Sequence, residues 1–270
     1  MTAPAIFTAV DGPHLPALGL SLGSIWAERL VSAIPVAGSL ITCENWVHPK
    51  KVLRDAITSS LGDPELVERS WSCLGVAETT VLRSCIEPTA EQKAQDPFMV
   101  QAQNYWERQV DQDALVAPST EIFGVVTLPN FQRALERKLY TYNAASATMS
   151  FLGVLVGFRY LHEAAQDPRI LAVARQVLQE TSQAVCRRYG YSIEAQARFA
   201  DSATRKYQDQ NIPDTLARNV RDPMRKLGRF DRLVGAASLC MEAGIEPRSL
   251  ALAIAAGLRY REPSDLAQKG

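Results

Sequence analysis

The sequence predicts a short α/β remnant, residues 1–120, followed by an all-α domain, residues 121–270. In the first part, short apolar runs alternate with turn residues, whereas in the second part apolar residues recur at helical spacing almost without interruption. A chain of 270 residues is long enough for two ordinary domains. Its 47% hydrophobic and 21% charged residues are typical of a globular protein and not of a disordered one.

The first part has the order strand, turn, helix, strand. Residues 5–10 form a strand-like run that ends at the turn residues 11–13, Asp-Gly-Pro. Residues 15–34 carry apolar side chains on one helical stripe, and residues 36–43 form the second apolar run. Polar residues that follow a strand in such a βαβ unit lie where open sheets bind their ligands. The rest of this part is expected to form a helix at residues 50–70 and short strands and loops at 72–115.

The second part consists of predicted helices. Pro168 and Pro247 stand where helices are expected to begin, because a first-turn residue needs no N–H donor, and Gly190 marks a helix end. The expected helices cover residues 129–149, 150–166, 168–189, 193–207, 213–220, 230–243 and 247–258.

Composition excludes several classes of function. Twenty-nine basic and twenty-nine acidic residues cancel, so no overall field attracts nucleic acid or an anionic membrane. The apolar runs are too short to span a bilayer, and the N-terminus has no signal-peptide pattern, so we expect a cytoplasmic protein without a membrane partner. No metal site is expected, since the scattered cysteines lack metal-ligand spacing and are expected to be buried thiols; they are Cys43, Cys73, Cys85, Cys186 and Cys240.

The segment around Lys138 carries the strongest chemical signal. On an α-helix Lys138 and Asn143 lie about 140° apart, with Ser146 between them. One broad face can thus present an amine, an amide and a hydroxyl to one cleft. A partly desolvated lysine can act as a general base, and an amide can stabilise a developing oxyanion. A solvated helix face is the alternative interpretation of the same pattern.

Two further features suggest binding. Asn45 follows Glu44 at the end of a predicted strand and could supply a second amide donor, although a turn or helix-capping asparagine would look the same. Local basic clusters fit an anionic substrate, because guanidinium groups match phosphate and carboxylate; solvated helix ends are the alternative. The basic candidates are Arg225, Lys226, Arg259 and Arg261, with Arg218, Arg221 and Arg232 as further ones.

The order of several motifs, from about residue 7 to about residue 265, resembles a known family. The motifs are Thr-Ala-Val with Gly-Pro at 8–13, Cys-Glu-Asn-Trp at 43–46, Glu-Arg-Lys-Leu-Tyr-Thr-Tyr-Asn at 136–143, the stretch from Tyr207 to Arg221, Asp-Pro-Met-Arg-Lys-Leu at 222–227 and Asp-Arg-Leu at 231–233. They are similar to mannitol-1-phosphate 5-dehydrogenase and its relatives, the long-chain polyol and hexuronate dehydrogenases. The resemblance implies a partial Rossmann sheet before a helical mannitol-dehydrogenase-type domain.

The resemblance also implies chemistry. Lys138 would be the general base on the alcohol being oxidised, with Asn143 and Asn45 bracketing its oxygen. The cofactor would be NAD, with Val10, Gly12, Glu44 and Asn45 as the positions nearest to it. The implied substrate is a small polyol or sugar phosphate, whose distal anion the basic clusters at Arg225-Lys226 and at Arg259 and Arg261 could hold.

Departures from the family pattern argue against ordinary dehydrogenase activity. Ser146 stands where the family has a histidine, Leu82 where it has an aspartate, and Gln101, near Trp106, where it has a glutamate. No GxGxxG motif occurs, and by the usual size of a Rossmann half we expect roughly ninety residues of the family pattern to be missing before Met1. The sheet would then have an exposed edge, which a partner chain or an oligomer could cover. The alternative function is therefore a non-redox or partner-dependent sugar-phosphate-binding module, or an enzyme that uses Lys138 as a base for isomerisation or elimination.

Overall fold

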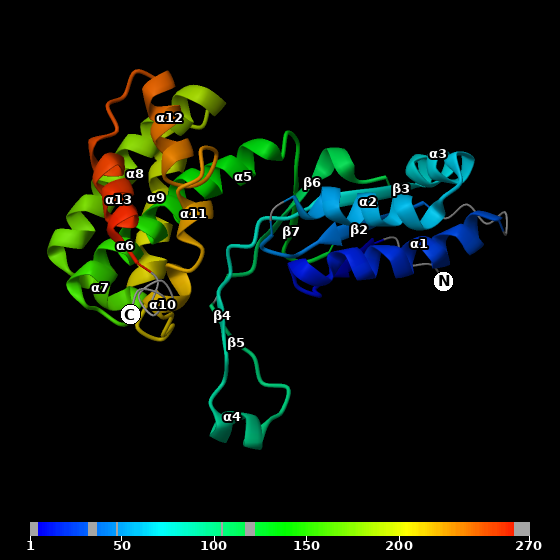
Figure 1. The fold of residues 1–270 in the computed structure, drawn as a ribbon, viewed down its shortest axis with the longest axis horizontal. Helices are drawn as coiled ribbons and strands as arrows, with labels where there is room; N and C mark the ends of the chain where they lie inside the picture. Colours follow the sequence, from blue (N-terminus) through cyan, green and yellow to red (C-terminus); the bar gives the residue numbers. More distant parts are fainter. Residues whose placement is uncertain (1–4, 32–36, 47, 104, 117–121, 262–270) are drawn as a thin grey trace, which may run out of the picture. The chain divides into compact units, whose positions relative to one another are not determined.

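The computed structural model describes residues 5–31, 37–46, 48–103, 105–116 and 122–261. The chain forms two compact units (Figure 1). The first contains Met1–Arg83 and Asn104–Ala134, and the second contains Ser84–Gln103 and Leu135–Gly270. The predicted α/β portion followed by a helical portion is confirmed, and each unit is described below by itself.

The first unit is built on a parallel sheet with the strand order β1–β2–β3. Its strands are β1 (Ala5–Thr8), β2 (Gly38–Thr42) and β3 (Leu74–Glu78). In the register, Thr42 lies opposite both Thr8 and Glu78, so the carboxyl ends of all three strands are level. The predicted helix and strand reach residues 32–36, which lie outside the described part of the chain.

Three helices accompany this sheet: α1 (Leu15–Val31), α2 (Pro49–Leu61) and α3 (Pro64–Cys73). The single helix predicted at residues 50–70 is in fact two. Gly62 has φ 67°, which ends α2, and the Asp63 side chain then accepts the Glu65 N–H at 2.8 Å and caps α3. Pro64 occupies the first position of α3, where no backbone donor is needed.

Helices α1 and α2 cross closely because glycines line the contact. A Cβ atom on Gly19 would come within 2.5 Å of the Ala56 Cβ, and one on Gly23 within 2.6 Å of the Ser60 Cβ. Below the crossing lies an apolar core shared by the two helices and the sheet. Its buried members are Leu15, Leu40, Leu53, Ile57, Leu61, Leu74 and Val76.

A second parallel pair extends this unit past the predicted boundary at residue 120. Strand β6 (Arg108–Asp111) continues into the 3₁₀ turn η2 (Gln112–Ala114) and pairs with β7 (Val125–Leu128). The Thr80 N–H donates to the Gln109 carbonyl at 3.0 Å, so β6 is joined to the segment that follows β3. Because β7 is held by this pairing, the first compact unit includes residues as far as Ala134.

The second unit contains a short ribbon and the helical portion. The ribbon pairs β4 (Cys85–Ile86) with β5 (Gln101–Ala102) in antiparallel fashion and carries the short helix α4 (Ala90–Gln95). From residue 130 to residue 261 every residue is described, and this stretch contains helices and no strand. The main helices are α5 (Gln132–Lys138), α6 (Ala144–Val156), α7 (Leu161–Gln166), α8 (Pro168–Tyr189), α9 (Ile193–Gln208), α12 (Val234–Glu242) and α13 (Arg248–Arg259), with the single turns α10 (Leu216–Asn219) and α11 (Pro223–Lys226).

Several predicted helix ends are confirmed. Asp167 caps α8 by accepting the N–H groups of Arg169 and Ile170, ahead of Pro168, and Gly190 ends the helix with φ 73°. The predicted break between residues 149 and 150 is wrong, because α6 runs through it to Gly157, which has φ 94°. Phe151 on α6 is fully buried and packs in the main helical core. Among the described residues, no helix is both long and apolar enough to cross a bilayer.

Candidate active site

Lys138 and Asn143 are joined by a π turn. Lys138 is the last residue of α5, and the five residues of η3 (Leu139–Asn143) form one π-helical turn that leads directly into α6. The Ala144 N–H donates to the Leu139 carbonyl, five residues back, and also to the Thr141 carbonyl. A π turn is wider than an α turn, so residues five apart lie closer to one face than the predicted 140°. Such single turns occur frequently at functional sites.

Both candidate side chains are partly buried, as is Ser146 one turn further on. Ser146 is hydrogen-bonded to the phenol of Tyr207 on α9. Burial raises the pKa of Tyr207 well above its usual value, and the nearby phenol of Tyr142 raises it further. Tyr207 is therefore a neutral hydrogen-bond donor at physiological pH. At the position where the resemblance implies an imidazole, this chain has two hydrogen-bonded hydroxyls, those of Ser146 and Tyr207.

A second lysine lies beside the turn, and the sequence pattern did not reveal it. The Lys206 amine stands 5.8 Å from the ring centroid of Tyr142 and 5.9 Å from that of Tyr207. Burial lowers the pKa of Lys206 to about 8, against the raising effect of Asp214. Lys206 is thus a buried amine with a lowered pKa beside the π turn, although no motif spacing distinguishes it from other lysines.

The predicted anion holders already have partners within the protein. Arg225 pairs with Asp222 at 2.5 Å and with Asp231 at 3.3 Å. The Lys226 amine is buried and donates to the Asn219 carbonyl at 2.6 Å and to the Arg221 carbonyl. Burial, together with nearby arginines, lowers the pKa of Lys226 to about 8.

The remaining basic candidates differ in exposure and pairing. Arg259 at the end of α13 is exposed, and so is Arg261, whose guanidinium donates to the carbonyls of Leu258 and Tyr260. Arg218 makes a two-point contact with Asp214 at 2.8 and 2.9 Å, and Arg232 pairs with Asp231 at 2.7 Å. A role of these residues in holding a substrate anion stays a prediction.

In the first unit, Glu44 ties two strand ends together. Its buried carboxylate accepts the Thr8 hydroxyl at 2.7 Å and the Val10 N–H at 3.1 Å. Asn45, the next residue, is exposed. Glu44 therefore fixes the loop from which Asn45 projects, at the carboxyl end of β2. The convergence of Asn45 with Lys138 on one oxygen stays a prediction.

The turn after β1 does not fit a dinucleotide pyrophosphate. Gly12 lies against the indole of Trp46, so close that a Cβ atom would come within 2.1 Å of the ring. Gly19 and Gly23 are used in the crossing of α1 and α2. Among the described residues, the β1–α1 connection thus offers no stretch of open glycine backbone to cradle phosphates, as the GxGxxG turn does.

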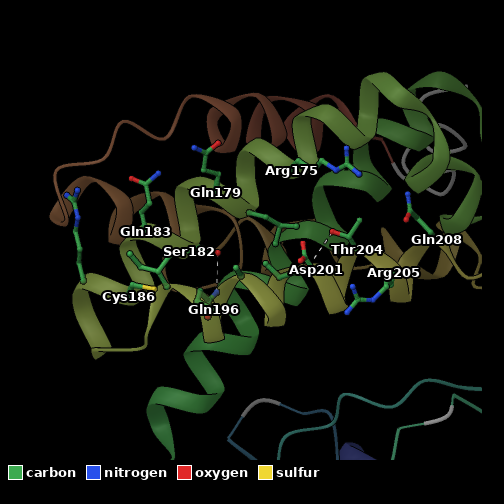
Figure 2. Close-up of a pocket in the computed structure, with 15 residues that line it drawn as sticks. Arg175, Gln179, Ser182, Gln183, Cys186, Gln196, Asp201, Thr204, Arg205 and Gln208 are labelled. Carbon is green, nitrogen blue, oxygen red and sulfur yellow. Dashed lines mark hydrogen bonds between the residues drawn. The ribbon is translucent and has the colours of Figure 1, made fainter.

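A groove of about 800 Å³ lies between α8 and α9 in the second unit (Figure 2). None of the predicted site residues lines it. Its floor includes Gln196, whose amide nitrogen donates to the Thr141 hydroxyl in the π turn at 3.0 Å. The groove is therefore a separate feature that adjoins the candidate site through Gln196, and through Leu178 and Ala200, which pack with Ala145.

Comparisons with known proteins extend these observations. A family model described as "Mannitol dehydrogenase C-terminal domain" matches residues 130–269. A mannitol-1-phosphate 5-dehydrogenase of Brevibacillus brevis is 31% identical over 266 residues, which cover 98% of this chain and 67% of that protein. The enzyme of the same name from Thermoanaerobacter pseudethanolicus is 28% identical and is covered to 66%. The chain thus spans about two thirds of the length of the curated relatives it matches.

Solved structures show the same fold. A D-sorbitol dehydrogenase in substrate-free form matches with a TM-score of 0.77 at 18% identity, over 97% of this chain and 61% of that one. A mannitol 2-dehydrogenase of Pseudomonas fluorescens, solved as a ternary complex with NAD and D-mannitol, matches with a TM-score of 0.69 at 18% identity, over 94% of this chain and 58% of that one. The predicted resemblance is confirmed by both kinds of comparison.

Proposed function

The chain belongs to the mannitol dehydrogenase family, and on that basis we propose that it is a polyol-phosphate dehydrogenase-like protein. The proposed reaction is the NAD-linked oxidation of mannitol 1-phosphate, or of a related polyol or sugar acid, to the keto sugar. The names of the Brevibacillus brevis and Thermoanaerobacter pseudethanolicus relatives support this substrate class. The observation that carries the proposal is the placement of Lys138 and Asn143 at the two ends of one π turn.

The proton transfer is assigned to Lys138. A neutral amine would accept the proton of the substrate hydroxyl as the carbon–oxygen bond gains double-bond character. The Asn143 amide would donate to the same oxygen, where negative charge develops, and Asn45 would supply a second amide donor. Because both asparagines remain neutral, they can stabilise the oxygen without competing for the proton.

The distal anion is assigned to the exposed cations. Arg259 and Arg261 have exposed guanidinium groups at the end of α13, and Arg225 presents a partly exposed one beside two aspartates. The Lys226 amine already donates to the backbone carbonyls of Asn219 and Arg221. It would therefore act by fixing the segment around these residues rather than by contacting the anion.

NAD is proposed as the cofactor because of a structurally similar enzyme, and not because of a binding site among the described residues. The Pseudomonas fluorescens enzyme was solved with NAD. In this chain, Gly12 is closed off by Trp46 and Glu44 is bound to Thr8 and Val10. We therefore assign only the proton transfer and the binding of the substrate oxygen to this chain's residues.

One observation favours a second candidate function. Ser146 replaces an imidazole with a hydroxyl that is already hydrogen-bonded to Tyr207. A serine cannot supply the charge or the reach of a histidine. The alternative is therefore a non-redox module that binds a sugar phosphate or acts together with a partner chain.

A chimera tests the proposal. This chain would be joined to the part of the Brevibacillus brevis relative that it does not match, and NAD reduction would be followed with mannitol 1-phosphate. Lys138→Met should lower turnover by roughly 10²–10⁴-fold, the usual contribution of a general base. Lys51→Met is the matched control, because Lys51 is an exposed lysine paired with Asp55 on α2. If the chimera is active and Lys138→Met has the same turnover as Lys51→Met, Lys138 is not the base. If the chimera is inactive but still binds mannitol 1-phosphate, the result favours the non-redox binding module.

A further inference from the structure

A π turn needs support from outside its own helix. Its hydrogen bonds are less favourable than those of an α-helix, and it contains one residue more than an α turn. If η3 relaxed to an α turn, the register would shift by one residue, which would rotate Lys138 by about 100° relative to α6. Lys138 and Asn143 would then no longer face the same oxygen. What holds the turn therefore decides whether the two side chains can act together.

Helix α9 supplies one support through Gln196. This side chain is fully buried, and its amide nitrogen donates to the Thr141 hydroxyl at 3.0 Å and to the Ser182 hydroxyl at 3.2 Å. Figure 2 shows the Gln196 amide directly facing Ser182 across the groove floor. Its oxygen accepts the Arg137 Nε–H at 2.7 Å. One amide thus binds a residue within the turn and the residue just before Lys138.

Arg137 is itself held firmly against α9. Its guanidinium lies 4.1 Å from the ring centroid of Phe199 and 4.3 Å from that of Tyr191, and it also donates to the Ala195 carbonyl at 2.9 Å. Cation–π contacts on both rings and two hydrogen bonds leave this side chain little freedom. The backbone that carries Lys138 is consequently fixed from its N-terminal side.

The other support is Tyr207, near the C-terminal end of α9. Its phenol donates to the Tyr142 carbonyl, within the turn, at 2.9 Å. The Tyr142 ring packs edge-on against Phe199 and Tyr207, with centroids 4.8 and 6.3 Å away. Because burial keeps Tyr207 protonated, this donor is present throughout the physiological pH range.

We propose that α9 is the positioning element of the candidate site, with Gln196 and Tyr207 holding the π turn and thereby orienting Lys138 relative to Asn143. The proposal deepens the function proposed above and rests on it for its catalytic meaning. Gln196 and Tyr207 are positioning residues, since they act on the turn and through it on the two side chains.

The test compares each variant with a matched control on the same groove or helix. Tyr207→Phe removes one hydroxyl, and its control is Thr204→Val, because the buried Thr204 hydroxyl donates within α9, to the Ala200 carbonyl. Gln196→Met removes the amide, and its control is Gln183→Met, since Gln183 is exposed and lines the same groove. If Gln196→Met does not fold, Tyr207→Phe decides the question.

The readouts are hydrogen exchange of the Ala144 amide, which closes the π turn, and the Lys138 Cε–Hε resonance assigned with Lys138→Arg. Tyr207→Phe should speed Ala144 exchange by roughly fivefold to tenfold, the effect of losing one hydrogen bond, while the buried Ala253 amide on α13 is unchanged. The Lys138 resonance should move in Tyr207→Phe and not in Thr204→Val. An unchanged Ala144 rate, or an equal rise at Ala144 and Ala253, overturns the proposal.

The same variants in the chimera test the catalytic meaning. Loss of orientation should lower kcat and leave KM nearly unchanged, because the substrate-binding cations are untouched. An active chimera with an unaltered kcat in Tyr207→Phe would overturn the positioning role. A chimera that is inactive in every form contradicts the proposed function instead, and the Ala144 measurement still decides for or against the support by α9.

Discussion

The phenol of Tyr207 donates a hydrogen bond to the main-chain carbonyl of Tyr142 at 2.9 Å, inside the π turn that separates Lys138 from Asn143. The two tyrosines are 65 positions apart in the sequence. Their contact joins the π turn of the candidate site to α9, one of the two helices that line the groove. The predictions below concern this region first and the first unit afterwards.

Lys206→Met should stabilise the protein near neutral pH. The pKa of Lys206 falls from 10.5 to about 8 on folding, so the unfolded state binds the proton more tightly. Between these two values the unfolded state holds more protons than the folded state, and stability rises with pH. Relative to Lys206→Met, the native chain should therefore be less stable below pH 8 by on the order of 1–3 kcal/mol, and this difference should shrink as the pH rises from 8 towards 10.5.

Urea unfolding at several pH values measures this difference. Lys51→Met serves as the control, because Lys51 is exposed and its removal should change little at any pH. A stability gap between Lys206→Met and the native chain that stays constant from pH 6 to pH 10 would show that the Lys206 amine is not titrating in the folded state.

Lys226→Met should destabilise the second unit. The Lys226 amine donates to the carbonyls of Asn219 and Arg221, and these would lose a buried partner. Leaving such acceptors unsatisfied costs about 1–3 kcal/mol. Arg229→Met, which removes an exposed cation nearby in the sequence, is the control. If thermal unfolding shows no loss but binding of mannitol 1-phosphate weakens, Lys226 is a ligand and not a structural lysine.

Gly23→Ala should destabilise the first unit even though alanine favours helices. The added methyl would come within 2.6 Å of the Ser60 Cβ and 3.0 Å of the Ile57 carbonyl oxygen, so α1 and α2 must separate. Overpacking of this kind costs about 1–3 kcal/mol. Ser21→Ala, on the exposed side of α1, should stay within roughly 0.5 kcal/mol of the native chain. Equal melting temperatures for the two variants would mean that the helices do not cross so closely.

The isolated 270-residue chain should bind NAD weakly or not at all. The β1–α1 turn is filled by Trp46 at Gly12, and it lacks an open glycine backbone for a pyrophosphate. Calorimetric titration should give a dissociation constant above about 100 µM. A tighter constant would require a phosphate site that the described residues do not offer in this turn.

Ser146→His in the chimera should raise turnover if the hydroxyl is what limits it. An imidazole at this position would restore the residue type expected from the family pattern, next to the Tyr207 phenol. Ser59→His, at an exposed position of α2 in the first unit, is the control. Equal turnover in the native chimera and in Ser146→His would show that the departure at this position does not explain any loss of activity.

The sequence by itself determined much of the helical framework. Pro168 with its capping Asp167, and Gly190 with a positive φ, fix the two ends of α8 through local chemistry, which a pattern of residues can reveal. The pairing of the first two strands around a helix also followed from the predicted βαβ unit. The helix end at Gly62 was not predicted, because the apolar spacing continues on both sides of this glycine and is compatible with one longer helix.

Only the tertiary structure decided how the candidate site is held. The motif from Lys138 to Asn143 was predicted as an α-helix, because apolar spacing does not separate an α turn from a π turn. The π turn exists together with partners on α9, and Gln196 is 55 positions from the Thr141 hydroxyl that it binds. Lys206 likewise acquires its lowered pKa from burial in the folded chain, where its amine lies 5.8 Å from the ring centroid of Tyr142. These features arise from long-range hydrogen bonds and desolvation, and local residue patterns carry neither.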